Sequence, residues 1–286
     1  MHIDRLAVVG TGLIGGSLAA ALKQAGVADE IIGLGRRRAT LEQARALGLI
    51  DAIADAPAQL AGAQMIVLAT PVAQMGPVLE AIAPHLDGKT IVTDAGSTKG
   101  DVIAAARRAL GRNFSRFVAG HPVAGAENSG PQAARADLFI GRHVVLCPEA
   151  ETDADALARV TALWQATGAQ VVHMDAARHD RIFAAVSHLP HLAAFALVDE
   201  LAARPDAGDF FRYAAGGFRD FTRIAASHPE MWRDIALANR EALLAELSAY
   251  MNNLAEIAAA LEKGDAAALE RIFSRASQAR RNWGTK

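Results

Sequence analysis

Residues 2–18 read HIDRLAVVGTGLIGGSL, and the rest of the chain is organised around this stretch. An apolar run over residues 6–9 is followed by Gly10-x-Gly12-x-x-Gly15 and then by a helix-forming segment. This order predicts a strand, a tight glycine turn and a helix, with Gly12 leaving room for a pyrophosphate and Gly15 allowing close helix–strand packing. The helix N-terminus would offer free N–H groups to the anion. Because a strand and a helix flank the glycines, the stretch indicates dinucleotide binding rather than a simple strand–helix turn.

The composition narrows the class of protein further. Of 286 residues, 52% are hydrophobic, which is ample for a buried core in one large or two ordinary domains. A net charge of −2 gives no reason to expect nucleic acid or an anionic membrane surface as a partner. The single cysteine, Cys147, excludes an internal disulfide and fits a reducing compartment, so we expect a cytoplasmic protein. The longest uncharged run, residues 56–79, contains three prolines and is not expected to cross a membrane.

A second strand is predicted over residues 30–34, and its end bears on the choice of cofactor. Folds of this kind that bind NAD place an acidic residue here, where it holds the ribose 2′-hydroxyl. Gly35 occupies the position instead and is followed by Arg36, Arg37 and Arg38, and no acidic residue occurs between residues 31 and 41. Arginine forks suit a phosphate group. We therefore expect NADP to be preferred over NAD, with Arg36 and Arg37 at the 2′-phosphate; the alternative is a solvated basic loop.

Apolar strands alternate with helical segments up to residue 174. Further strands are predicted at residues 65–69, 90–93, 117–119, 143–147 and 170–174. This alternation predicts an α/β Rossmann-type fold with a doubly wound, mostly parallel sheet. Ligands of such sheets bind outside the carboxyl ends of the strands. Thr70-Pro71, residues 94–99 and residues 120–122 all follow strand ends, so we expect them to meet at one rim of the sheet.

Beyond residue 174 the sequence has a helical period. Helices are predicted over residues 180–203, with a kink at Pro190, over 210–226, over 230–261 and onward to about 282. One continuous apolar seam with a 4-3 spacing lies in the long helix, formed by Leu243, Leu247, Tyr250, Leu254, Ile257 and Leu261. A seam of this length needs a partner surface. We expect an NADP-binding domain at 1–173 and an all-helical dimerisation and substrate domain at 174–286, which forms a homodimer through the C-terminal helices.

His121 is the leading candidate for a catalytic residue. It lies at a predicted strand end between Gly120 and Pro122, and the proline biases its backbone toward extended geometry. A histidine at the cofactor rim suits general-base chemistry because its ordinary pKa is near neutrality, although most histidines in proteins are packed or surface residues. Ser97, on the neighbouring loop, is expected to orient that imidazole or to bond the substrate. Lys99 is expected to be solvated or to face a phosphate.

Two polar motifs in the helical part add candidates for substrate binding. Residues 187–191 read SHLPH, with Ser187 and His188 at the start. No acidic cluster accompanies the two histidines of this motif, so we expect substrate contacts and no metal site. Residues 218–223 read FRDFTR, where arginines lie among aromatic residues. Such arginines suit a substrate carboxylate, above all Arg223, or an internal salt bridge.

Six motifs occur together in a fixed order: GTGLIGGSL at residues 10–18, TP at 70–71, DAGSTK at 94–99, GHPVAGAENSG at 120–130, SHLPH at 187–191 and GGFRDFTRIAASHPEMWRDI at 216–235. Together they resemble the prephenate and arogenate dehydrogenases, the cyclohexadienyl dehydrogenases of tyrosine biosynthesis. The likeness covers nearly the whole chain. The combination is specific, whereas the glycine turn alone is not.

The resemblance implies NAD(P)-dependent oxidative decarboxylation of prephenate or L-arogenate, to 4-hydroxyphenylpyruvate or tyrosine. Hydride would leave the ring carbon that bears the hydroxyl, and the ring carboxylate would depart as CO2. His121 matches the family's histidine that accepts the hydroxyl proton, and Ser97 the serine that bonds histidine and substrate. His188 matches a substrate-site histidine, and Arg223 the arginine that binds a carboxylate. The remaining expected contacts are Ser187 and Gly125 for the substrate, and Gly10, Gly12, Leu13, Ile14, Gly15, Gly35, Arg36, Arg37, Thr70 and Pro71 for the cofactor.

Two positions depart from the family pattern, and two other functions stay open. Many members carry an acid where Gly35 stands, and a threonine is common where Ala126 stands. A β-hydroxyacid dehydrogenase or imine reductase would share the domain order but place a catalytic lysine or aspartate in the helical part. A non-catalytic NADP-binding sensor or scaffold would bind the cofactor without turnover. His121 and the SHLPH segment favour a prephenate or arogenate dehydrogenase over the first alternative. The set of His121, Ser97 and Arg223 favours it over the second.

Overall fold

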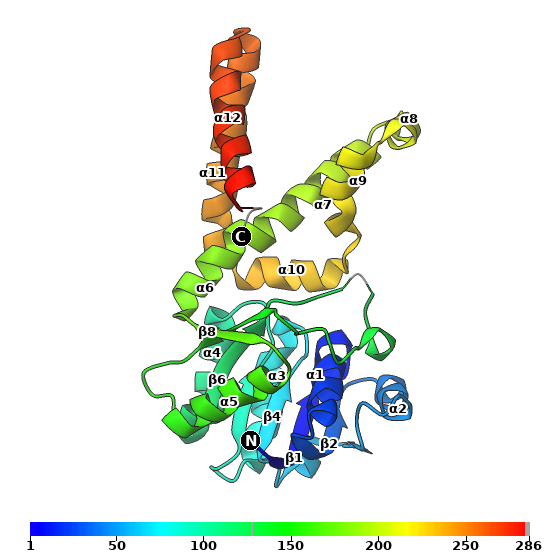
Figure 1. Ribbon diagram of the computed structural model, residues 1–286, viewed down its shortest axis with the longest axis vertical. Coiled ribbons are helices and arrows are strands. Elements are labelled where there is room, and N and C mark those ends of the chain that lie inside the picture. The colour runs from blue at the N-terminus through cyan, green and yellow to red at the C-terminus, as the bar shows by residue number, and fades with distance from the viewer. Residues whose placement is uncertain (127, 284–286) are drawn as a thin grey trace. The chain divides into compact units, whose positions relative to one another are not determined.

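The computed structural model describes residues 1–126 and 128–283, and the chain divides into two compact units, Met1–Asn239 and Arg240–Lys286 (Figure 1). The first unit contains an eight-stranded sheet formed by β1 (Ile3–Val9), β2 (Ala28–Leu34), β3 (Ala52–Ile53), β4 (Met65–Leu68), β5 (Ile91–Asp94), β6 (Phe117–Pro122), β7 (His143–Cys147) and β8 (Gln170–His173). Their spatial order is β3-β2-β1-β4-β5-β6-β7-β8. Among these strands β6 and β7 pair antiparallel, and all other neighbours are parallel. The prediction of a doubly wound, mostly parallel sheet is confirmed.

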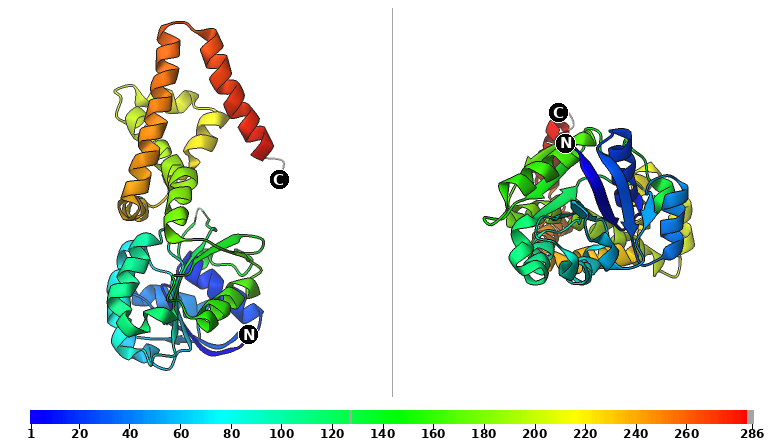
Figure 2. Two further views of the ribbon diagram at one scale, coloured as in Figure 1. Left: turned by 90° about the vertical axis from the view of Figure 1, so that its left-hand side faces the viewer. Right: turned by 90° about the horizontal axis from the view of Figure 1, so that it is seen from below.

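Helices cover both faces of the sheet (Figure 2). One face is packed by α1 (Leu13–Gln24), α2 (Arg38–Ala46) and α5 (Ala154–Ala166), and the other by α3 (Val72–Ile82) and α4 (Gly100–Leu110). Successive strand residues point to opposite faces, so Leu6 and Val8 belong to the α1 side of the core and Ala7 and Val9 to the α3 side. Strands buried on both faces are therefore apolar at nearly every position, which is why they read as uninterrupted apolar runs.

The turn between β1 and α1 depends on its glycines. Gly10 has a φ of +95°, and a Cβ at this position would lie 2.6 Å from the carbonyl oxygen of Ala69. A Cβ on Gly15 would overlap the carbonyl oxygen of Gly10. The first turn of α1 therefore packs directly against the end of β1. Gly12, in contrast, has open space where a Cβ would stand.

The chain beyond β8 is helical, but two of the predicted helices are broken into shorter ones. It forms α6 (Ala176–Phe183), a π turn (Ala184–His188), α7 (Leu189–Ala202), α8 (Ala207–Tyr213), α9 (Gly216–Thr222), a 3-10 turn (Arg223–Ala226) and α10 (Pro229–Ala238). The predicted single helix over 210–226 is wrong. Ala214 and Ala215 adopt extended backbone geometry just before two glycines, and glycine is a poor helix former.

The segment Ala176–Ala202 stays helical through Pro190. A proline has no N–H, so the carbonyl four residues before it lacks an α-helical donor, and the chain forms a π turn just ahead of it. By length and composition this segment is long and apolar enough to cross a membrane, but a single helix of this kind is weak evidence for a membrane protein. It carries the buried histidines His179 and His188, which contact other elements of the first unit.

The prediction of one helix over residues 230–261 is also wrong. The chain forms α10 and then α11 (Arg240–Glu262), with a break at Asn239. Asn239 is buried, and its Nδ2 donates a hydrogen bond to the backbone carbonyl of Asp180 at 2.7 Å. These two residues are 59 positions apart, so the local helical period contains no sign of the break.

The second unit consists of α11 and α12 (Ala266–Trp283), which are joined at Gly264-Asp265 as predicted and diverge from that turn in Figure 2. Several residues of the apolar seam on α11 are exposed, Leu254 by 45% and Leu261 by 63%. Phe273 on α12 is 56% exposed. Exposed apolar surface of this kind is typical of an interface between subunits.

Candidate active site

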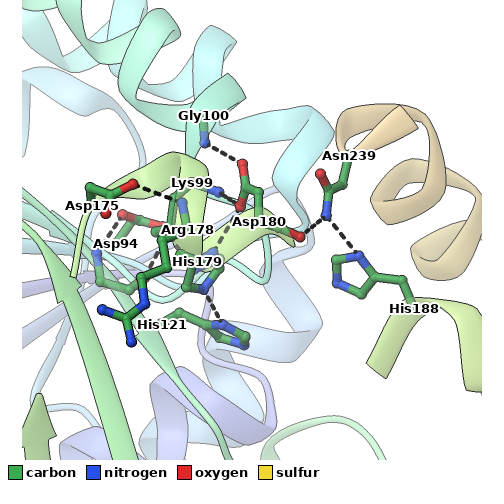
Figure 3. Close-up of polar contacts among 12 residues, drawn as sticks. Asp94, Lys99, Gly100, His121, Asp175, Arg178, His179, Asp180, His188 and Asn239 are labelled. Carbon is green, nitrogen blue, oxygen red and sulfur yellow. Dashed lines mark hydrogen bonds and ion pairs between the residues drawn. The ribbon is translucent and has the colours of Figure 1, made fainter. Parts of the chain in front are cut away.

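The carboxyl ends of β1, β4, β5 and β6 meet at one rim of the sheet, because these parallel strands are neighbours. The rim carries the glycine turn after β1, Thr70 after β4, Asp94 at the end of β5 and His121 on β6. Figure 3 shows His179 and Asp180, from α6, facing this rim. These strand ends meet at one rim, as the sequence predicted, and we take this rim as the candidate site.

The turn at the start of α1 fits a dinucleotide. Gly12 caps the helix without a side chain, so the N–H groups of the first turn are left for an anion, and no acidic residue in that turn repels one. Leu13 and Ile14 begin the helix and are half-buried. Thr70 adjoins the turn, with its hydroxyl buried and unpaired among the described residues. Pro71, at the start of α3, is exposed.

The loop between β2 and α2 carries the predicted arginines. A Cβ on Gly35 would make only an ordinary contact, at 3.6 Å, with one leucine side chain, so this position has room for a larger residue. Arg38 forms ion pairs with two acidic side chains, on α2 and after β3. Arg36 and Arg37 are exposed and form no ion pair among the described residues. Of the three arginines, these two are the ones that could pair with a phosphate without losing a partner.

Lys99 is a correction to the sequence prediction of a solvated or phosphate-facing charge, because its side chain is fully buried. Its Nζ forms an ion pair with Asp94 and donates to the backbone carbonyl of Gly120 at 2.7 Å. Asp94 also accepts from the backbone N–H of Gly120 at 3.0 Å and of Gly96 at 2.8 Å. A buried charge has to be paired, and this pair fixes the strand end that carries His121.

His121 is buried on β6, and polar and aromatic contacts hold its ring. Nδ1 lies 2.8 Å from Nε2 of His179, and the ring of Phe183 packs edge-on with the centroids 4.6 Å apart. The other nitrogen, Nε2, makes no hydrogen bond among the described residues. Burial lowers the pKa of His121 well below its ordinary value of 6.5, and the charges of His179 and Lys99 lower it further. The imidazole is therefore neutral near pH 7, as a general base must be.

His179 and Asp180 complete this contact, and neither was among the candidates from the sequence. His179 Nδ1 lies 2.8 Å from a carboxylate oxygen of Asp180. The same carboxylate accepts from the backbone N–H of Lys99 at 2.9 Å and of Gly100 at 2.8 Å. Burial alone would raise the pKa of Asp180, but the hydrogen bonds from His179 and these N–H groups hold it below its ordinary value. The signal in the sequence that could have found this cluster is a His-Asp pair at the start of an apolar helical segment.

His188 and Asn239 form a second buried pair (Figure 3). Nδ2 of Asn239 lies 3.1 Å from Nδ1 of His188 and donates also to the carbonyl of Asp180. Because the amide nitrogen is the donor, Nδ1 of His188 accepts and its Nε2 carries the hydrogen. That Nε2 is buried and unpaired among the described residues, which makes it a donor suited to a substrate. Burial lowers the pKa of His188 to about 4.

The remainder of the SHLPH motif packs against α10. The ring of His191 stacks on Trp232 with the centroids 3.5 Å apart, and His191 Nδ1 lies 2.9 Å from the carbonyl of Ser187. Ser187 is half-buried. Trp232 was not a candidate from the sequence, yet its Nε1 is a second buried donor that is unpaired among the described residues. Its ring centroid lies 6.1 Å from that of His188.

The other candidates from the sequence, Ser97, Gly125 and Arg223, are less buried. Ser97 is half-buried. The partner of His121 Nδ1 is His179, not this serine. Gly125 is exposed on the segment after β6. Arg223 is exposed in the 3-10 turn after α9. Burial lowers the pKa of His191 and the charge of Arg223 lowers it further, so this guanidinium lies near the SHLPH motif.

A group of possible metal ligands, His2, Asp4 and Asp29, also occurs among the described residues. All three are exposed, and they lie at the amino ends of β1 and β2. Parallel strands carry this end opposite the rim described above, so the group is no part of the candidate site.

The glycine turn suits a dinucleotide, and a buried neutral histidine lies at the same rim. The ring N–H groups of His188 and Trp232 are unpaired among the described residues. Together these features indicate a nucleotide-binding dehydrogenase. Two family models match the chain: the prephenate dehydrogenase nucleotide-binding domain over residues 18–173, and the prephenate dehydrogenase dimerization domain over residues 175–275. The chain belongs to the prephenate dehydrogenase family.

Known relatives agree with this assignment over nearly the whole chain. The cyclohexadienyl dehydrogenase of Zymomonas mobilis is 37% identical over 279 residues, which are 96% of this chain and 94% of the relative. The structure of a prephenate dehydrogenase from A. aeolicus, in complex with hydroxyphenyl propionate and NAD+, has a TM-score of 0.91 at 33% identity and covers 98% of this chain and 99% of its own. The Synechocystis arogenate dehydrogenase structure has a TM-score of 0.82 at 32% identity, with the same coverage of 98% and 99%. The chain is thus an enzyme of the prephenate, arogenate or cyclohexadienyl dehydrogenase type.

Proposed function

We propose that the chain catalyses the NAD(P)-dependent oxidative decarboxylation of prephenate, L-arogenate or both, with 4-hydroxyphenylpyruvate or tyrosine as the product. The observation that carries this proposal is His121, a neutral and buried imidazole at the nucleotide rim whose Nε2 has no other partner among the described residues. The substrate class is supported by the relatives, which are prephenate, arogenate and cyclohexadienyl dehydrogenases. We assign residues 1–173 to nucleotide binding and residues 174–286 to substrate binding and dimerisation.

His121 moves the proton in this mechanism. Its Nε2 removes the proton of the hydroxyl on the substrate ring, while the ring carboxylate leaves as CO2 and the ring becomes aromatic. A bound nicotinamide would supply the hydride acceptor for the carbon that bears the hydroxyl. Since Nδ1 of His121 is engaged by His179, the proton is taken at Nε2. The residues that would hold the dinucleotide are Gly10, Gly12, Leu13, Ile14, Gly15, Thr70 and Pro71.

The helical part binds the substrate. Arg223 holds a substrate carboxylate in a charge-assisted pair, and His188 donates to the substrate through its Nε2–H. Ser97 contacts the substrate hydroxyl. It is not needed to orient His121, because His179 already holds that imidazole at Nδ1. Ser187 and Gly125 complete the substrate surface.

NADP is the preferred cofactor in this proposal. Gly35 offers no carboxylate to the ribose 2′-hydroxyl, so NAD lacks the anchor that an acid would give it. Arg36 and Arg37 have no acidic partner among the described residues, whereas Arg38 is already paired. A 2′-phosphate would pair with these two guanidinium groups. The NAD+ in the A. aeolicus structure belongs to that enzyme, and NAD remains the second cofactor here.

We also propose that the enzyme is a cytoplasmic homodimer. The exposed apolar residues of α11 and α12, together with the match to a dimerization domain, support pairing through the C-terminal helices. The single cysteine, Cys147, is buried and unpaired, which suits a reducing compartment.

Steady-state kinetics tests the proposed reaction. Prephenate, L-arogenate and a simple β-hydroxyacid are each assayed with NAD and with NADP. Turnover is expected with prephenate, L-arogenate or both, and not with the β-hydroxyacid. His121→Asn should lower kcat by roughly 10²–10⁴-fold with KM nearly unchanged, because only proton removal is lost. His85→Asn, at an exposed histidine, serves as the control and should keep kcat. Turnover of the β-hydroxyacid alone, or cofactor binding with no turnover at all, would refute the proposal.

A further inference from the structure

The side chain of His179 links the ring of His121 to the carboxylate of Asp180 (Figure 3). His121 Nδ1 contacts His179 Nε2 at 2.8 Å, and His179 Nδ1 contacts Asp180 at 2.8 Å. The carboxylate is held in turn by the backbone N–H groups of Lys99 and Gly100, at the start of α4. The three side chains come from β6 and α6, so the contact joins the sheet to the first helix beyond it.

The carboxylate determines where each hydrogen along this chain lies. Asp180 is ionised and can only accept, so the hydrogen of the His179 ring lies on Nδ1. Burial lowers the pKa of His179, which keeps that ring neutral and leaves its Nε2 as an acceptor. His121 must then donate from Nδ1, and its own Nε2 carries no hydrogen.

We propose that His179 is a positioning residue that holds His121 as the Nδ1–H tautomer, with Nε2 as the base, and that Asp180 imposes this arrangement through His179. The inference rests on the proposed role of His121. In the opposite tautomer Nε2 would present an N–H to the substrate hydroxyl and would be unable to take its proton. When Nε2 is protonated, the contact from Nδ1–H to His179 also stabilises the imidazolium that forms.

Packing is the competing explanation for His179. The side chain is fully buried, and its ring centroid lies 4.4 Å from that of Phe183. The two roles predict different kinetics, because only a positioning residue acts through His121. Effects of residues that act as a unit do not add, whereas independent effects on two sites do.

Variants at position 179 separate these roles. His179→Phe keeps a ring but removes the acceptor. We expect kcat to fall about tenfold or more, but by no more than the roughly 10²–10⁴-fold loss expected when the base itself is removed. The substrate KM should change little. His179→Gln retains one donor and one acceptor and is expected to recover most of kcat. In a His121→Asn background, His179→Phe should lower kcat no further.

The tautomer can also be read in the wild-type enzyme. Nitrogen-15 NMR of the imidazole rings distinguishes protonated from bare ring nitrogens, and the His121 signals are assigned by their absence in His121→Asn. We expect a protonated Nδ1 and a bare Nε2 in His121. This measurement decides the question even if His179→Phe does not fold.

Three results would overturn the inference. They are a protonated Nε2 in His121, an unchanged kcat in His179→Phe, and a kcat in His121→Asn/His179→Phe that falls by the product of the two single losses. The proposed function fails separately, if His121→Asn keeps more than about a tenth of wild-type kcat. A low kcat in His121→Asn with wild-type kcat in His179→Phe would leave the proposed function standing and remove the positioning role.

Discussion

At the residue scale, the buried imidazoles of the candidate site are neutral, and its buried ammonium group is paired with a carboxylate. Burial lowers the pKa of His121 and of His188, and each ring has one nitrogen fixed by a neighbouring side chain. The ammonium of Lys99 is paired with Asp94. Arg223 is different, since it is exposed and lies close enough to His191 for its charge to lower the pKa of that ring.

Arg223→Ala should weaken substrate binding. The loss of a charge-assisted hydrogen bond to a carboxylate costs about 1.5–3 kcal/mol, or roughly a 10–150-fold rise that is seen mainly in KM. Arg219→Ala, at an exposed arginine one helical turn earlier, is the matched control and should leave KM unchanged. The measurement is kcat/KM for prephenate and L-arogenate. Equal values for wild type and Arg223→Ala would mean that Arg223 does not bind the carboxylate.

At the element scale, the loop between β2 and α2 makes the sharpest prediction for this chain. The double variant Gly35→Asp/Arg36→Ala adds an acceptor for the ribose hydroxyls and removes one of the two proposed ligands of the 2′-phosphate. A Cβ fits at Gly35, and each charged hydrogen bond is worth about 1.5–3 kcal/mol. The ratio of kcat/KM for NADP to that for NAD should therefore fall by roughly tenfold or more.

Arg38→Ala is the control for this prediction. Arg38 lies in the same loop but is paired with Glu42 and Asp55, so its removal should leave the cofactor ratio close to that of wild type. Two results would contradict the NADP proposal: a wild-type enzyme that favours NAD, or a double variant that keeps its preference for NADP. In either case the arginines would form a solvated loop.

At the scale of the whole molecule, stability should decline in mild acid. Burial lowers the pKa of His188 from an ordinary 6.5 to about 4, so between these values the unfolded chain binds a proton that the folded chain does not. Above pH 6.5 this difference in proton binding has no effect on stability. As the pH falls from 6.5 toward 4, it lowers the free energy of unfolding by about 3 kcal/mol in all. Urea denaturation at several pH values measures it. His188→Gln should show a smaller slope over this range, and an unchanged slope would contradict the assignment.

The C-terminal helices should hold two copies of the chain together. Leu254 and Leu261 are 45% and 63% exposed on α11, and a soluble protein rarely leaves such a seam uncovered. Sedimentation should show a dimer at micromolar concentration, and Leu254→Glu/Leu261→Glu should shift it to monomer. Asn252→Glu, an exposed position of the same helix outside the seam, is the charge control. A wild-type monomer would mean that the seam has another role.

The sequence by itself determined the parts of this protein that depend on neighbouring residues. The glycine turn after β1, the two-sided apolar strands and the order of strand and helix follow from local sterics and from a period of two or 3.6 residues. The strand-end position of His121 follows from the same pattern, because parallel strands bring their carboxyl ends to one rim. The family assignment followed from motifs that are each continuous in the sequence.

Only the tertiary structure decided the partners of the buried polar groups. The contact between His121 and His179 spans 58 positions, that between Asp180 and the N–H of Lys99 spans 81, and the bond from Asn239 that interrupts the long helix spans 59. A periodic pattern records which face of an element is apolar, but it holds no information about the residue that faces it from another element. For this reason Lys99 was expected to be solvated or to face a phosphate. It is buried because folding brings the carboxylate of Asp94 and the carbonyl of Gly120 to its ammonium group.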